Sequence, residues 1–263
     1  MELRLQFEEI DLLRDRIGGD LSSEEMQASH ILKVAMVDWA IVTPPCHTHS
    51  RAPWSNNFGP CPVRSKAYPR GFPWLDKVLA AKAELANNLV DFTWKMMSAV
   101  QAQRSSRWCS GLAEHPEDFG IVHSWDPCSI PASIWQMQEP HDLVEIHGWQ
   151  TRAFHQAPFG AKTAKGTRIL FCEGCFSELG VEGWPTFSAQ GRYSGPLEHM
   201  ANPGGYSMMR KAGDSGAFKT SESAAYPSLL CKFFAFKAVK AFKEHVPTLR
   251  GGGYLWKCSL PSD

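Results

Sequence analysis

The chain lacks three features that would each place it in a special class of protein. It carries 27 basic and 27 acidic residues among 263, so it has no net charge with which to attract an acidic polymer. No stretch approaches the roughly 18 consecutive apolar residues of a membrane-spanning helix, and Met1-Glu2-Leu3-Arg4 lacks the apolar core of a signal peptide. Eight cysteines spread through the chain indicate reduced thiols and not a disulfide framework. We therefore expect an intracellular protein, nuclear in a eukaryote, with no membrane partner.

The hydrophobic content of 43% predicts a folded chain, close to the upper size limit of a single core. Apolar residues recur at helical spacing over 74–103, which predicts one long helix or two consecutive ones. Short apolar runs alternate with such segments, which is typical of an α/β fold. The expected helices are 22–35, 74–103 and 227–244, and the expected strands are 36–43, 109–114, 143–156 and 167–172.

The most informative stretch is Thr43-Pro44-Pro45-Cys46, which ends a short apolar run. Two prolines fix their φ angles and donate no hydrogen bond, so the strand must stop there. The carboxyl ends of strands in an open α/β sheet are where substrates bind. A cysteine held at that rim is well placed to act as a nucleophile, although taken alone it is more often a buried structural thiol.

Three more short motifs follow in order, namely Glu114-His115-Pro116, the segment from Phe159 to Arg168, and Ala224-Ala225-Tyr226-Pro227. The four together resemble the C5-cytosine DNA methyltransferases. That family runs from a PPC turn through a Glu-containing strand end and a Tyr-Gly turn before an Arg-x-Arg strand, and closes with a Pro-containing helix. The likeness covers roughly residues 10–240. Within the family, the chain resembles divergent members of mobile-element type most.

The resemblance implies a mechanism and a fold. The thiolate of Cys46 would add to C6 of cytosine, Glu114 would handle the proton at N3, and Arg168 would hold the ring oxygen. S-adenosyl-L-methionine would supply the methyl group to a base that has left the duplex stack. The implied fold is a mostly parallel Rossmann-like sheet flanked by helices. The cofactor residues implied by the likeness are Asp11, Pro44 and Tyr226.

The sequence departs from the family in two places. Gly166 stands where the second arginine is expected. Before Cys46 the only glycines are Gly18 and Gly19, which form no glycine-rich turn after a strand, so we expect the first strands and the usual cofactor segment to be missing. The expected organisation is a truncated catalytic core at 1–172, a variable and possible DNA-reading segment at 173–220, a returning helix at 221–245 and a flexible tail at 246–263.

Positive charge is distributed unevenly despite the neutral total. The stretches 47–75 and 147–171 contain no acidic residue and flank the expected active-site strands. Because phosphate contacts supply much of the affinity for DNA, we expect DNA as partner. The expected DNA-binding residues are Arg51, Arg64, Lys66, Arg70, Lys162 and Lys165.

Two other interpretations stay open. The chain could be a non-catalytic nucleic-acid-binding remnant of such an enzyme, or an unrelated scaffold in which Cys46 is inert. Cys172-x-x-Cys175 resembles half a zinc site, but a second pair at comparable spacing is missing, so no metal is predicted.

Overall fold

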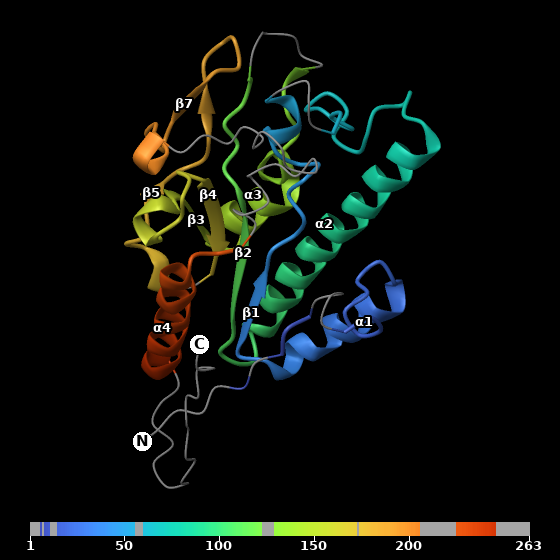
Figure 1. Cartoon of the computed structure of the whole chain (residues 1–263). Helices are drawn as coiled ribbons and strands as arrows, with labels where there is room; N and C mark the ends of the chain where they lie inside the picture. Colours follow the sequence, from blue (N-terminus) through green and yellow to red (C-terminus); the bar gives the residue numbers. More distant parts are fainter. Residues whose placement is uncertain are drawn as a thin grey trace, which may run out of the picture.

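The computed structural model describes residues 6, 8–10, 15–55, 60–122, 129–172, 174–205 and 225–245. At its centre lies a five-stranded sheet in the order β1-β2-β4-β3-β5 (Figure 1). Its strands are β1 (Trp39–Val42), β2 (Ser110–Pro116), β3 (Gln150–His155), β4 (Gly166–Phe171) and β5 (Val181–Glu182). The expected α/β class is confirmed.

The expected mostly parallel sheet is wrong. Only β1 and β2 pair in parallel, whereas β2 with β4, β3 with β4 and β3 with β5 are antiparallel. The physical reason lies in the connection at 156–165, which is shorter than the dozen or more residues that a parallel crossover needs. Gly160 turns this connection with a φ of 93°, so β4 folds back and inserts between β2 and β3. The strands β1, β2 and β3 therefore share one direction, and β4 opposes them.

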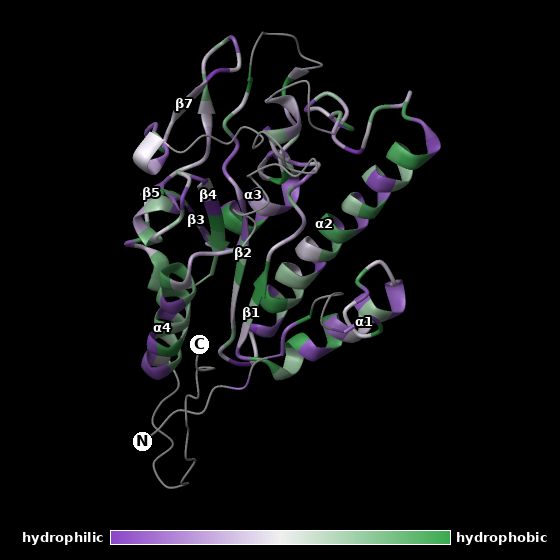
Figure 2. Cartoon of the chain, in the orientation of Figure 1, coloured by the Kyte–Doolittle hydropathy of each residue, from purple (hydrophilic) through white to green (hydrophobic). Residues whose placement is uncertain are grey.

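Helices cover both faces of the sheet, with α2 on one side and α4 on the other (Figure 1). Because alternate residues of a strand point to opposite faces, each strand contributes to two cores. Ala113 and Leu170 pack in the core on the α2 side, whereas Leu112 and Ile169 pack in the core on the α4 side. Figure 2 shows the apolar residues concentrated on the central strands. The helices are α1 (Glu24–Lys33), α2 (Lys77–Gln103), α3 (Gln138–Glu145) and α4 (Ser228–His245).

The segment expected to form one or two helices is a single helix of 27 residues. Asp76 begins α2 by accepting hydrogen bonds from the backbone N–H groups of Val78 and Leu79. Its buried face includes Val90, Met97 and Val100, which follow the helical repeat.

The expected strand at 143–156 is only half right. Leu143 belongs to α3, and Gly148 leaves that helix with a φ of 70°, so strand β3 begins at Gln150. A two-stranded ribbon of β6 (Thr186–Phe187) and β7 (Tyr193–Gly195) lies within the segment expected to be variable.

Two expectations cannot be compared with the structure, because Asp11 and the tail at 246–263 lie outside the described residues.

No helix within the described ranges combines the length and the apolar character needed to cross a membrane. The proposed domain boundaries stay predictions.

Candidate functional site

The parallel pairing of β1 and β2 brings their carboxyl ends to one rim of the sheet. Val42 pairs with Ala113, so the turn from Thr43 to Cys46 leaves β1 beside Glu114 on β2. The thiol of Cys46 and the carboxyl of Glu114 are close enough to interact electrostatically, and Lys165 acts on both. The structure therefore brings together Cys46 and Glu114, which sequence motifs alone had suggested.

Cys46 is an exposed residue whose thiol has a raised pKa. The residue as a whole is exposed, yet burial of the sulfur raises the pKa of the thiol above its ordinary value. The negative charge of Glu114 raises that pKa further, whereas Lys165 lowers it. The raised pKa keeps the free thiol mainly in its neutral form, and the charge of Glu114 contributes to that rise.

Glu114 is a buried carboxyl that titrates near neutrality. It is 5% exposed, on the α4 side of the sheet. Burial raises its pKa to about 7, against the opposing effects of the Tyr226 hydrogen bond and of Lys165. A carboxyl with this pKa is present in both protonation states at pH 7, which suits a general acid.

Tyr226 lies just before α4 and contacts the carboxyl directly. Its hydroxyl donates to Oε2 of Glu114 and accepts from the side chain of Thr43. Burial raises the pKa of Tyr226, and the neighbouring Glu114 raises it further, so the phenol keeps its proton. Tyr226, which was expected to bind a cofactor, is a hydrogen-bond donor to Glu114 in this structure.

Lys165 borders the same site in a strained conformation. Its ammonium lies 5.1 Å from the centre of the Tyr226 ring. Its φ of 39° is in the left-handed region, which costs a side-chain-bearing residue about 1–3 kcal/mol and recurs at functional sites. The sequence had suggested DNA binding for this lysine and named it as the cation nearest to the missing second arginine, but nothing in its pattern shows a left-handed turn.

The expected catalytic role of Arg168 is not compatible with its position. In the β2–β4 register Arg168 lies opposite His115, while Glu114 lies opposite Ile169, so Arg168 occupies the other face of the sheet. It is fully buried and forms two hydrogen bonds to Glu117, with Nε–Oε2 at 2.7 Å and Nη2–Oε1 at 2.9 Å. Its Nη1 donates to Thr151 and to the carbonyl of Gly183. Arg168 is therefore a structural ion-pair partner.

The expected DNA-binding residues separate into three groups. Arg64 is fully buried and donates to the carbonyl of Ala83 and to Asn87, so it is not available to phosphate. Arg70 is half-exposed but forms an ion pair with Asp91 at 2.6 Å. The remaining four are at least partly exposed: Arg51, Lys66, Lys162 and Lys165.

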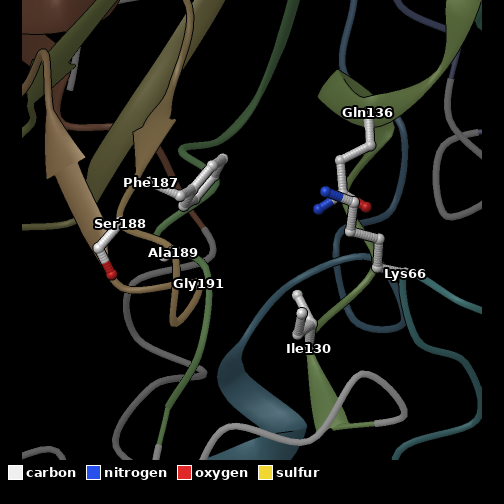
Figure 3. Close-up of a pocket in the computed structure, with 7 residues that line it drawn as sticks. All are labelled: Lys66, Ile130, Gln136, Phe187, Ser188, Ala189 and Gly191. Atoms are coloured by element: carbon white, nitrogen blue, oxygen red, sulfur yellow. The ribbon is translucent and has the colours of Figure 1, made fainter.

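A cavity of about 200 Å³ lies away from Cys46, between the β6–β7 ribbon and the segment around Lys66 (Figure 3). Phe187 and Gly191 face it from the ribbon, and Lys66 and Gln136 face it from the other side. The amide of Gln136 donates to the buried Asp118 at 2.7 Å. The cavity is not lined by Cys46 or Glu114, so it is a separate feature.

The described residues do not fit the expected cofactor well. Pro44 is buried beside the site, Tyr226 is engaged with Glu114, and Asp11 lies outside the described ranges. A Cβ on Gly18 would meet the Asp15 carboxylate at 2.5 Å, so this glycine packs on its own loop and not toward a ligand. Within the described ranges, no three His, Cys, Asp or Glu side chains are grouped to hold a metal ion.

Cys172 has a local role that the zinc interpretation did not foresee. Its sulfur accepts hydrogen bonds from the Gly111 N–H at 3.2 Å and from Arg104 at 3.3 Å.

No protein-family model matches this chain, and neither a curated protein nor a solved structure shows significant similarity to it.

Proposed function

We propose that the chain carries the base-activating half of a DNA cytosine-5 methyltransferase-like site. The observation that carries the proposal is the meeting of Cys46 and Glu114 at one rim, with the pKa of Glu114 raised to about 7. A thiol beside a carboxyl that can hold a proton at neutral pH is the pair that addition to a pyrimidine ring requires.

Addition of Cys46 to cytosine needs only the thiol, the Glu114 proton and the base. The Cys46 thiol first loses its proton to solvent, and its thiolate then forms a bond to C6 of cytosine. The electron pair of the C5–C6 double bond moves through the ring toward N3, which takes the proton held by Glu114. The product is a neutral enamine whose C5 is nucleophilic. Lys165, which lowers the pKa of the Cys46 thiol, favours the thiolate that begins the step.

In the family that the motifs resemble, S-adenosyl-L-methionine supplies a methyl group to that carbon. The described residues supply the groups that activate the base and do not build a donor pocket. We therefore assign to this chain the addition step, within the cell where thiols stay reduced, with nucleic acid as the partner.

The addition step has a readout that needs no methyl donor. C5 of the enamine takes a deuteron from D2O, and the original C5 hydrogen then leaves as a proton to solvent. N3 returns its proton to the Glu114 carboxylate as the thiolate leaves C6, so cytosine has exchanged its hydrogen at C5. We expect the purified chain to catalyse this exchange in cytosine-containing oligonucleotides, measured by mass spectrometry of the released nucleosides. Cys46→Ser should abolish the exchange, whereas Cys61→Ser, at another exposed cysteine, should not. No exchange by the wild-type chain, or equal exchange by Cys46→Ser, would refute the assignment.

A second candidate is a binding protein without catalysis. The contact between Tyr226 and Glu114 favours it, because the phenol occupies the carboxyl oxygen that would face N3. This alternative expects binding of nucleic acid that weakens with salt and is unchanged in Cys46→Ser.

A further inference from the structure

An exposed stack of aromatic rings precedes helix α2. The rings of Phe72 and Trp74 stack with centroids 5.0 Å apart and planes 11° from parallel. Tyr68 meets both rings edge-on, at 5.9 Å from Phe72 and 5.3 Å from Trp74. Trp74 is nevertheless 64% exposed. A large aromatic side chain held in a stack and left open to solvent is typical of a binding surface.

The segment that carries the rings is fixed to α2 by buried contacts. Arg64 donates to the carbonyls of Pro69 and Ala83, at 2.7 and 2.8 Å, and Asn87 donates to the carbonyl of Arg70 at 2.9 Å. Gly71 has a φ of 124°, and a Cβ there would lie 3.3 Å from the Cβ of Ala83. The stack is therefore preorganised, so a ligand that covers Trp74 has little loop entropy to overcome.

The charge around the stack is positive. Residues 60–84 contain five basic residues, but Arg64 is buried and Arg70 is paired with Asp91, so the basic side chains left around the stack are Lys66, Lys77 and the half-buried Lys82. The acids of the same range are Asp76 and the exposed Glu84. Asp76 is engaged as the N-cap of α2. Lys66 and Lys77 are exposed on either side of the aromatic segment. This charge favours a polyanion over an apolar peptide as the partner.

The stack is also connected to the candidate site. Arg64 donates to Nε2 of His49 at 2.8 Å, three residues beyond Cys46. Burial and the charge of Lys82 lower the pKa of His47, which places Lys82 near the turn that holds the thiol. Lys82 on the second turn of α2 thus acts on the residue that follows Cys46.

We propose that Phe72 and Trp74 form a stacking platform for a base of single-stranded nucleic acid, and that the strand continues past Lys82 toward Cys46. Stacking requires an open base face, which an unpaired strand offers and an intact duplex does not. The inference rests on the proposed function for the presence of a strand at Cys46, and deepens it by naming the single-stranded form as substrate.

The test is binding of the full chain to a labelled single-stranded pyrimidine oligonucleotide, of DNA and of RNA, and to the matching DNA duplex, by fluorescence anisotropy. Loss of one base–aromatic contact costs about 1–3 kcal/mol, so Trp74→Ala should weaken single-strand binding about 5- to 150-fold. Trp74→Phe should retain most of the affinity. Phe236→Ala removes an equally exposed ring from α4, 65% exposed, and should have no effect.

The outcomes separate this inference from the proposed function. Weaker binding in Trp74→Ala, with an unchanged circular dichroism spectrum, supports the platform even if no C5 exchange occurs, and then only the chemistry fails. Unchanged binding in Trp74→Ala, or binding to the duplex alone, overturns the platform. If C5 exchange occurs in the same case, the chemistry stands without it.

Discussion

Replacing Glu114 with glutamine should stabilise the fold at alkaline pH, because the native site forces a carboxylate into a buried position. The pKa rises from 4.5 in the unfolded chain to about 7 in the folded one. At 1.36 kcal/mol per unit, this difference corresponds to about 3 kcal/mol. Since the folded pKa is raised, the folded state favours the protonated form. The wild-type chain therefore loses about 3 kcal/mol of stability from this group as the pH rises from about 4.5 to about 7.

Urea unfolding at pH 5 and pH 8 measures this effect. Glu114→Gln removes the titrating group. Because a small part of the difference is already lost at pH 5, the stability of the variant relative to wild type should rise by about 2.5 kcal/mol between the two pH values. Glu139→Gln at an exposed position of α3 is the control and should show little change. If the relative stability of Glu114→Gln is the same at both pH values, the carboxyl is not held in the buried state on which its proposed role depends.

Three further expectations follow from the same contacts. The C5 exchange requires one proton shared between Cys46 and Glu114, so its rate should rise through pH about 7 and fall only above the raised pKa of the thiol; a rate with no change near pH 7 would contradict this. Tyr226→Phe removes a hydrogen bond that lowers the pKa of Glu114, and the rise in exchange rate should move to higher pH, as a pH–rate profile would show. Arg168→Met leaves Glu117 buried without its partner and should cost about 3–5 kcal/mol in urea unfolding, whereas adding Glu117→Met should recover much of that loss.

The sequence predicts which residues lie at the strand ends better than which face of the sheet each buried side chain occupies. Two prolines after a short apolar run place Cys46 at a strand end, and the parallel pairing of β1 with β2 then brings Glu114 beside it. The hydrophobic repeat likewise indicates α2, because an amphipathic helix of 27 residues leaves a strong pattern.

The position of Arg168 could not be predicted, because the sequence pattern does not contain the register between strands. Whether this arginine faces Glu114 or the opposite side depends on the register between β2 and β4, and a shift of one residue would reverse it. The place of β4 in the sheet is likewise not contained in the sequence pattern. The short connection before β4 does not show that this strand lies between β2 and β3. Arg64 seemed available for phosphate because it lies in a basic segment. Its partners Ala83 and Asn87 lie on helix α2, and the sequence does not show that this helix packs against the segment.

The contacts of Arg64 have a consequence for how the molecule opens. One buried guanidinium joins the segment after Cys46, the loop at Pro69 and the helix at Ala83. None of these segments can separate from the others without leaving a buried polar group unpaired, which costs about 1–3 kcal/mol or more for a charged group. They should therefore open as one cooperative unit, and their backbone amides should exchange with deuterium at a common free energy.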